Sequence, residues 1–358
     1  MRKGNFVGLD IAKNVFQVFT ADDKLREISN KKLSRNAMVC YFAQLPPSTI
    51  GIEACGMAHY WVRTLAAYGH TVKLISTQRV KAFLGHRNKT DVADAKAICE
   101  ALTHPGTRFI RAKSAEEQDT DHLLARRERL VQARTQIINQ TRSFLSERGI
   151  VIPQGSHHFM KNIAQIISEA WDTFGGDFQA VLTDNYADYE EHDAKIKKLD
   201  TLIAERAKRI EPSQRLMRIC GIGPQAAVAL VAHIGDAKQF NNGRQLSAYL
   251  GLTPRECSSG GKQRLLGITK RGNGRLRTLL VLGAHAVMQG IGRRKRGEDG
   301  QPCRLTSLDK WVLALKARIG TCKTAVALAN KIARMAWVIL AKGEEFNPLK
   351  ACPIKEPA

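Results

Sequence analysis

Residues 5–20 have the sequence NFVGLDIAKNVFQVFT, and this stretch decides the fold class of the N-terminal part of the chain. It is rich in Val, Ile and Phe, is interrupted by the polar Lys13-Asn14, and is followed by Asp22-Asp23. This pattern predicts a strand, a bend and a second strand. The downstream pattern predicts a strand at 48–53, a helix at 57–68, a strand at 71–75 and a helix at 91–102. Two strands followed by alternating helices and strands favour an α/β layer domain.

The composition indicates a polyanionic partner. The chain has 358 residues, enough for about two domains, and a formal net charge of +23. Nucleic acid is the default partner of so basic a protein. Residues 206–296 hold 18 Lys and Arg against 3 Asp and Glu, a net charge of +15, so one region holds most of the excess. With no signal peptide and no run of 18 apolar residues, we expect a cytoplasmic protein with no membrane contact.

Two long helices are predicted after the α/β part. One seven-residue series comprises Leu123, Leu130, Ile137 and Phe144, with Leu124, Val131, Ile138 and Leu145 beside it, and a second comprises Tyr189, Ile196, Ile203 and Ile210. Apolar residues every seven positions are typical of a coiled coil. The pattern favours an arm or a dimerisation element, with an intramolecular helical hairpin as the alternative. We therefore expect a domain at 1–119, a helical arm at 120–210, a mostly helical basic domain at 211–345 and a tail at 346–358.

The eight cysteines do not form a recognisable metal motif. No pair has CxxC spacing, which argues against a structural zinc site. We interpret them as small buried hydrophobic residues or free thiols.

Four carboxylates of the first domain occupy informative positions. Asp10 lies within an apolar strand, and Glu53 ends the strand Ile50-Gly51-Ile52-Glu53. Asp91 and Asp94 are three residues apart at the start of a predicted helix, and therefore face the same way. An ionised carboxylate inside an apolar strand is costly unless it is paired or bound to a metal.

A cluster of these four acids could hold two divalent cations for phosphoryl chemistry. Carboxylate ligands suit Mg²⁺ or Mn²⁺ rather than zinc. Taken singly, the residues have ordinary explanations: Asp91 as a helix cap or dipole partner, and Glu53 as a strand-end ion pair. Only the complete set favours catalysis.

The basic region contains three glycine-rich turns. The first, Cys220-Gly221-Ile222-Gly223, could present backbone N–H groups to a phosphate between two helices. The others, Ser258-Ser259-Gly260-Gly261 and Gly272-Asn273-Gly274, lie among cations that favour contact with a nucleic-acid backbone. These cations are Lys262, Arg264, Lys270, Arg271, Arg275 and Arg277. Few aromatic residues lie between them, which argues against stacking of single strands here.

These motifs together resemble the DEDD family of insertion-sequence transposases over nearly the whole chain. The motif Lys89-Thr90-Asp91-x-x-Asp94-Ala95 is intact, and the family's tetrad falls on Asp10, Glu53, Asp91 and Asp94. The resemblance implies a mixed-sheet RuvC-like domain of the RNase H-like class, followed by a helical arm and a basic domain. It also implies metal-dependent cutting and joining of DNA by these four residues.

The serine before Gly260-Gly261-Lys262 matches the family's serine nucleophile, which is here Ser259. The resemblance implies that it links covalently to a DNA phosphate, and the register favours it over Ser258. It further implies a structured bridge RNA that pairs with donor and target DNA. The family assembles as a multimer, a dimer or tetramer, in which carboxylates and serine come from different subunits.

Two other functions are compatible with the residues themselves. One is a hydrolytic, structure-specific nuclease of RuvC-like type, in which the tetrad activates water and Ser259 is structural. The other is a nucleic-acid-binding protein with a decayed active site, against which the intact tetrad argues.

Overall fold

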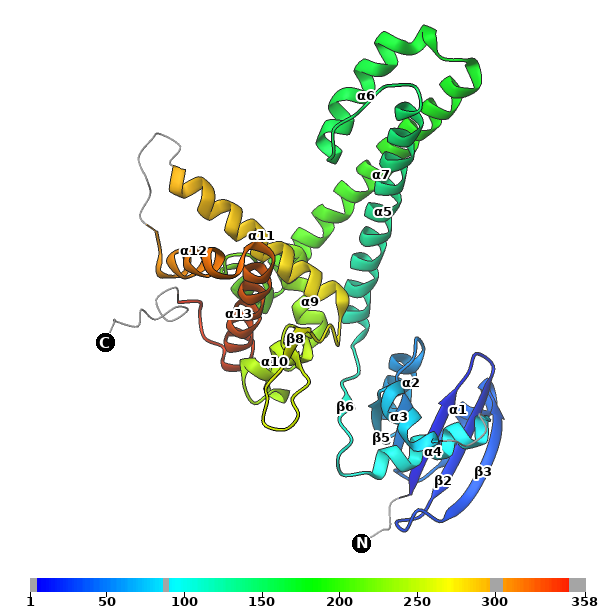
Figure 1. The fold of residues 1–358 in the computed structure, drawn as a ribbon. Coiled ribbons are helices and arrows are strands. Elements are labelled where there is room, and N and C mark those ends of the chain that lie inside the picture. The colour runs from blue at the N-terminus through cyan, green and yellow to red at the C-terminus, as the bar shows by residue number, and fades with distance from the viewer. Residues whose placement is uncertain (1–4, 86–89, 297–304, 348–358) are drawn as a thin grey trace, which may run out of the picture. The chain divides into compact units, whose positions relative to one another are not determined.

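The computed structural model describes residues 5–85, 90–296 and 305–347. Contacts divide the chain into two compact units, Met1–Gln118 and Asp119–Ala358, called units 1 and 2 below. Figure 1 shows the elements of each.

Unit 1 is built on a six-stranded mixed sheet of order β3-β2-β1-β4-β5-β6. The strands are β1 Phe6–Ile11, β2 Val15–Ala21, β3 Glu27–Ser34, β4 Thr49–Glu53, β5 Thr71–Ile75 and β6 Phe109–Ile110. Strand β2 is antiparallel to β1 and β3, whereas β1, β4 and β5 run parallel and β6 is antiparallel to β5. The helices are α1 Arg35–Gln44, α2 Ala58–Ala67, α3 Thr77–Leu84 and α4 Asp91–Thr103. The arrangement confirms the predicted α/β mixed sheet and is consistent with an RNase H-like domain.

Strand periodicity assigns the two faces of the sheet. Val7 and Leu9 of β1 and Ile50 and Ile52 of β4 pack in one cluster with α1 and α2. The alternate residues of both strands therefore face the other side, where α3 and α4 pack. This second face carries both Asp10 and Glu53.

Unit 2 begins with two long helices that pair within the chain. Helices α5 Ala115–Ser146 and α7 Gly176–Arg209 are joined by α6 Ser156–Ala170 and the short η1 Trp171–Thr173. Arg127 pairs with Asp200, Arg134 pairs with Asp193, and Asn185 donates to the Thr141 hydroxyl. The residue numbers of these contacts increase along α5 and decrease along α7, so the two helices are antiparallel neighbours (Figure 1).

The predicted heptads are largely accounted for by this intramolecular hairpin. Leu130, Ile138 and Leu145 of α5 are buried, as are Tyr189 and Ile196 of α7. The connector adds Phe159 and Ile163 to the same apolar cluster. The alternative of a helical hairpin within one chain therefore explains the stripes, and a second chain is not needed to cover them. Assembly into dimers or tetramers stays a prediction.

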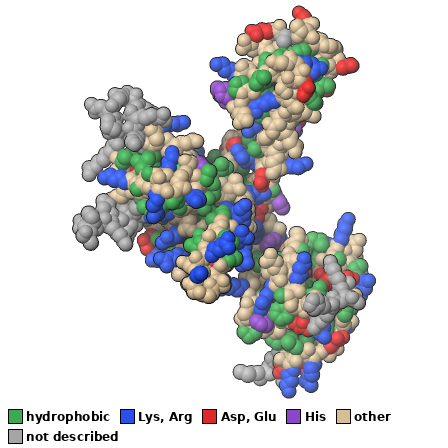
Figure 2. Space-filling model, in the orientation of Figure 1, with side chains coloured by type: hydrophobic (Ala, Val, Ile, Leu, Met, Phe, Trp, Pro, Cys, Tyr) green, Lys and Arg blue, Asp and Glu red, His purple; other side chains and the backbone are tan. Residues whose placement is uncertain are grey.

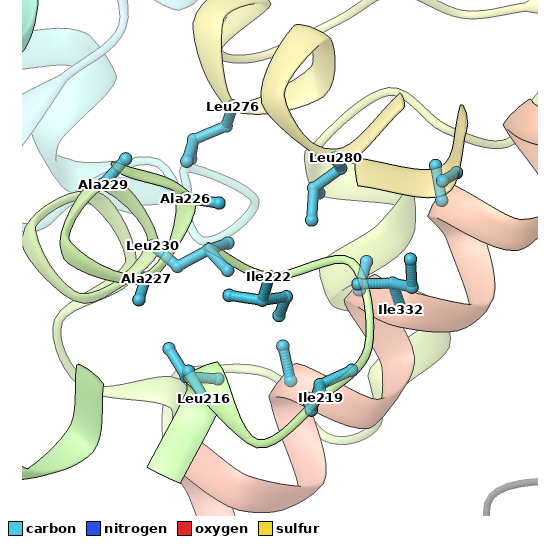
Figure 3. Close-up of a cluster of buried hydrophobic side chains, with 14 of the residues drawn as sticks. Leu216, Ile219, Ile222, Ala226, Ala227, Ala229, Leu230, Leu276, Leu280 and Ile332 are labelled. Carbon is cyan, nitrogen blue, oxygen red and sulfur yellow. The ribbon is translucent and has the colours of Figure 1, made fainter. Parts of the chain in front are cut away.

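The rest of unit 2 is mostly helical, as predicted. Its helices are α8 Glu211–Met217, α9 Pro224–Ile234, η2 Ala237–Gln239, α10 Gly243–Tyr249, α11 Gly274–Arg296, α12 Ser307–Ile319 and α13 Thr321–Lys342. A small hairpin of β7 Pro254–Glu256 and β8 Leu265–Ile268 lies between α10 and α11. In Figure 3, side chains of α8, α9, α11 and α13, such as Leu216, Leu230, Leu280 and Ile332, point toward one another in the core.

Helix α13 is the one described helix long and apolar enough to cross a membrane by composition. It contains Lys331 and Arg334, and Leu328, Ile332 and Ala336 on its apolar side are fully buried in the core of unit 2. The burial of this side identifies α13 as a core helix.

The cysteines that the structure describes form no disulfide. Cys40, Cys55, Cys220, Cys257 and Cys322 are exposed free thiols, and Cys99 is buried. Burial raises the pKa of Cys99 to about 12, which keeps this thiol protonated and unreactive. Cys303 and Cys352 lie outside the described residues.

Candidate active site and nucleic-acid interface

The carboxylates of unit 1 gather at one end of the sheet. Parallel pairing sets Leu9 of β1 beside Ile52 of β4, so Asp10 and Glu53 follow at the next position of adjacent strands. Both side chains are half-buried and lie on the face covered by α4. This register sets Asp10 and Glu53 near each other, at the same end of two adjacent strands.

Two glycines allow α4 to lie directly on this face. A Cβ on Gly8 would lie 2.0 Å from the carbonyl oxygen of Ala95, and one on Gly51 would lie 3.1 Å from the Cβ of Leu102. Ala95 directly follows Asp94, so contact with β1 holds the start of α4 beside Asp10. The sequence interpretation assigned no role to Gly8 or Gly51. Their signal was an isolated glycine inside an apolar strand, which marks close approach of another backbone.

The first turn of α4 presents two acids. The Thr90 hydroxyl accepts a hydrogen bond from the backbone N–H of Ala93 and caps the helix. Because Thr90 is the cap, Asp91 and Asp94 are not needed for that role. Asp91 is exposed and Asp94 half-buried. Lys89, part of the predicted motif, lies outside the described residues.

Three neighbouring acids act electrostatically on Asp10. Burial, and then the negative charges of Asp94, Asp91 and Glu53 in that order, together raise the pKa of Asp10 to about 6. Only the backbone N–H of Ile11 opposes the shift. A carboxylate ionised at neutral pH among three others calls for a compensating cation.

The donor set fits a divalent cation with oxygen ligands. Asp10, Glu53, Asp91 and Asp94 supply only carboxylate oxygens, the ligands that Mg²⁺ and Mn²⁺ prefer. Within the described part of the chain, no three Asp, Glu, His or Cys side chains are close enough together to hold a metal ion. The structure therefore places Glu53, Asp91 and Asp94 close enough to act on the charge of Asp10, but the four carboxylates are not close enough together to bind one metal ion.

Replacing Gly8 with alanine is expected to separate the carboxylates. The new methyl group would overlap the backbone of Ala95, so α4 must shift away from β1. We expect a loss of stability of more than about 2 kcal/mol and a loss of cleavage activity. Urea unfolding and a DNA-cleavage assay measure the two effects. Gly56→Ala is the matched control, because a Cβ there meets nothing within 4 Å. Wild-type stability in Gly8→Ala would contradict the close packing.

The predicted nucleophile lies at the tip of the hairpin in unit 2. Ser259 and Lys262 pair across a two-residue turn, and the backbone N–H of Lys262 donates to the Ser259 carbonyl over 3.1 Å. The central residues Gly260 and Gly261 have φ of 56° and 74°. Positive φ at both positions is the requirement of a type I′ turn, which explains why both are glycine. The turn leaves Ser259 exposed.

The two neighbouring serines differ in their contacts. The Ser258 hydroxyl donates to Glu256 over 2.6 Å and accepts from the backbone N–H of Arg264 over 3.3 Å. Ser258 therefore ties the two sides of the hairpin together. Among the described residues, the Ser259 hydroxyl makes no side-chain hydrogen bond. Ser258 thus has a structural role in the hairpin, and the assignment of Ser259 as the nucleophile stays a prediction.

The six predicted nucleic-acid-binding cations fall into two groups. Lys262, Arg264, Lys270 and Arg271 are exposed. Arg275 instead pairs with Glu128 of α5 over 2.7 Å. Arg277 donates to the carbonyls of Leu250 and Arg271, which gives it a structural role. Figure 2 shows many Lys and Arg side chains on the face of unit 2 that carries the hairpin.

The loop with Lys270 and Arg271 is held by its backbone. The N–H of Lys270 donates to the Gly251 carbonyl over 3.2 Å, and a Cβ on Gly272 would lie 2.1 Å from the Tyr249 carbonyl oxygen. The side chains of Lys270 and Arg271 take no part in this packing and are exposed. They can be removed without dismantling the loop.

We therefore expect Lys270→Ala with Arg271→Ala to weaken nucleic-acid binding without sequence preference. Each lost phosphate contact should lower the slope of log affinity against log salt by about 0.7–0.9. Binding titrations at several salt concentrations measure this slope. The pair Lys198→Ala with Lys208→Ala makes the same change in charge at two exposed lysines of α7. An unchanged slope in the loop variant would place the binding surface elsewhere.

The first glycine-rich turn has a packing role. A Cβ on Gly283 of α11 would lie 1.9 Å from the Gly221 carbonyl oxygen, so this turn presses against α11. Ile222 is buried in the core. Close packing thus accounts for Gly221, and phosphate binding by the turn stays a prediction.

Comparison with known proteins defines the class of this molecule. Residues 7–149 match a transposase model of the DEDD type, which spans the sheet and the carboxylates. Residues 213–296, which contain the serine hairpin, match a model described as "Transposase IS116/IS110/IS902 family". The molecule is a DEDD-type transposase, an enzyme that cuts and joins DNA.

Relatives that match over most of both chains are also transposases. A "Probable family 20 transposase" of Pseudomonas aeruginosa is 38% identical over 96% of this chain and 98% of the relative. The transposase for insertion sequence element IS1111A of Coxiella burnetii is 37% identical over 97% and 92%. That for IS1328 of Yersinia enterocolitica is 34% identical over 95% and 98%. The chain belongs to the IS110 family of insertion-sequence transposases.

Proposed function

We propose that this transposase cuts DNA by attack of Ser259 on a phosphodiester, assisted by the carboxylates of unit 1. The observation that carries the proposal is the hairpin: an exposed serine whose hydroxyl makes no side-chain hydrogen bond among the described residues, beside a serine whose hydroxyl makes two. The nearby cations Lys262 and Arg264 can offset the negative charge of a phosphate.

The proposed reaction conserves the energy of the DNA backbone. The Ser259 Oγ loses its proton and bonds to phosphorus, while the bond from phosphorus to one deoxyribose oxygen breaks and that oxygen takes up a proton. The product is a serine–DNA phosphodiester and a free DNA hydroxyl. Attack by a DNA hydroxyl on the same phosphorus then releases Ser259 and joins the strands.

The carboxylates would serve this reaction through a divalent cation. Asp10, Glu53, Asp91 and Asp94 would hold Mg²⁺ or Mn²⁺, which when bound supplies a Lewis acid for the phosphate oxygens. The raised pKa of Asp10 supports this assignment, because a cation offsets the repulsion that the other three acids impose.

The two halves of the site lie in different compact units, and we propose that they meet in an assembled complex. Asp10 belongs to unit 1 and Ser259 to unit 2. A dimer or tetramer on DNA could supply carboxylates and serine from different subunits. Mixing Asp10→Asn protein with Ser259→Ala protein tests this sharing. Recovered activity would show that subunits complement each other.

A structured guide RNA is the further partner that we propose. The basic region at residues 206–296, with its net charge of +15, could bind the backbone of RNA as well as that of DNA. The DNA flanking the gene offers the test: we expect element ends and a noncoding stretch able to fold. RNA copurifying with the protein should match that stretch.

A covalent adduct separates this function from the hydrolytic alternative. End-labelled DNA is incubated with protein and Mg²⁺ and run on a denaturing gel. Serine attack gives a retarded band that protease removes, whereas hydrolysis gives free fragments alone. The absence of any cleavage with an element-end substrate would favour the non-enzymatic alternative.

A further inference from the structure

A second site is suggested by a cavity in unit 2. It has a volume of about 550 Å³ and is formed by the start of α10, the C-terminal half of α13 and the segment after α13. This size is within the range of small-molecule sites, about 300–1,000 Å³. No residue of the proposed tetrad or serine hairpin lines it.

The walls of the cavity combine apolar and cationic side chains. Met335, Trp337 and Phe346 supply apolar surface, and Arg244, Lys331 and Arg334 supply positive charge. All of these belong to unit 2, and Arg244 and Arg334 are exposed.

The tryptophan is held in a fixed orientation. Its indole N–H donates to the carbonyls of Ala237 and Phe240 over 3.2 and 3.1 Å. The ring is therefore anchored by its polar edge. What it offers to the cavity is apolar ring surface.

Two glutamates, Glu344 and Glu345, also line the cavity, but they do not neutralise Arg244 or Arg334. Glu345 pairs with Arg218, and Glu344 lies 3.9 Å from Lys342. Lys331 lies over the ring of Trp311 at 5.0 Å. Arg244 and Arg334 form no ion pair with the described residues. A Cβ on Gly243 would lie 3.0 Å from the backbone of Arg334, so the two arginines come from backbones in direct contact.

We propose that this cavity binds an unpaired nucleotide of the nucleic acid on which the protein acts. A base has two apolar faces that suit Met, Trp and Phe, and its phosphates suit two unpaired arginines. Nucleotide binding in this cavity rests on the proposed function in one respect: both take nucleic acid as the partner of the protein. It requires neither the serine nor the metal chemistry.

Photo-crosslinking to the full chain tests the proposal directly. A single-stranded hexamer with one 5-iodouracil base is bound without Mg²⁺, irradiated and digested with trypsin. DNA and RNA hexamers form the two arms and distinguish the source of the nucleotide. We expect a crosslink on the peptide Met335–Lys342, which contains Trp337. Crosslinks confined to residues 254–277 would overturn the cavity site and leave the proposed function intact.

A binding comparison separates a base site from a merely basic surface. Wild-type protein should bind a thymidine or uridine hexamer about tenfold tighter than an abasic hexamer with the same phosphates, the effect of stacking one base. Phe346→Ala should reduce this preference. Arg244→Ala with Arg334→Ala should weaken binding of all hexamers, including the abasic one, more than the control pair Lys198→Ala with Lys208→Ala does. Equal affinity of the wild type for abasic and base-containing hexamers would overturn the proposal.

Discussion

Ser259→Ala is expected to abolish both the covalent protein–DNA adduct and recombinant product. Without its hydroxyl the proposed nucleophile is gone, and we expect the rate of joining to fall by at least about a thousandfold. Ser259 is exposed and its hydroxyl makes no side-chain hydrogen bond among the described residues, so stability should change by no more than about 0.5 kcal/mol. Adduct formation on a denaturing gel and thermal unfolding measure the two quantities.

Ser258→Ala is the matched control for this variant. It removes the hydrogen bonds to Glu256 and Arg264 but leaves the proposed nucleophile, so substantial activity should remain. An adduct that persists in Ser259→Ala and is lost in Ser258→Ala would move the nucleophile by one residue. If both variants recombine at the wild-type rate, the hydrolytic function replaces the serine mechanism.

Asp10→Asn and Asp94→Asn are expected to abolish strand cleavage while DNA binding survives. Each substitution removes one carboxylate from the proposed metal site and leaves the +15 region unchanged. We expect cleavage to fall by at least about a thousandfold. Cleavage of labelled DNA with Mg²⁺ and a filter-binding assay measure the two properties. Glu27→Gln, an exposed acid of the edge strand β3, is the control and should cleave normally.

Thermal unfolding gives these variants a readout that does not depend on activity. Burial and three like charges oppose the ionised form of Asp10, so the neutral amide should leave the metal-free protein at least as stable as the wild type. Mg²⁺ should raise the melting temperature of the wild type, and this rise should be lost in Asp10→Asn. A full Mg²⁺ effect in that variant, or wild-type cleavage in either, would contradict the metal-site assignment.

The sequence indicated the ends of β1 and β4 better than it indicated what holds α4 against them. Strand patterns placed Glu53 at the end of one strand and Asp10 within another, and the apolar setting of Asp10 favoured a carboxylate cluster. The close approach of α4 depends on Gly8 meeting Ala95, a contact between residues far apart in the chain. A glycine in a strand signals such an approach but does not name the partner.

Charge alone did not distinguish binding residues from structural ones. Arg275 and Arg277 belong to the same basic run as Lys270 and Arg271. Arg275, however, forms an ion pair, and Arg277 donates to two backbone carbonyls. The partners, Glu128 and Leu250, are set by tertiary packing. The seven-residue series likewise predicted two long helices but not their packing partner, because periodicity does not distinguish a helix of the same chain from one of a second chain.

The central claim is that Ser259 joins the protein to DNA, and mass mapping of the adduct tests it most directly. Wild-type protein is incubated with element-end DNA and Mg²⁺, the covalent complex is isolated under denaturing conditions, and nuclease and protease reduce it to nucleotide-bearing peptides. The account predicts a nucleotide phosphate on Ser259. A phosphate on another residue, or cleaved DNA with no peptide attached, would contradict it.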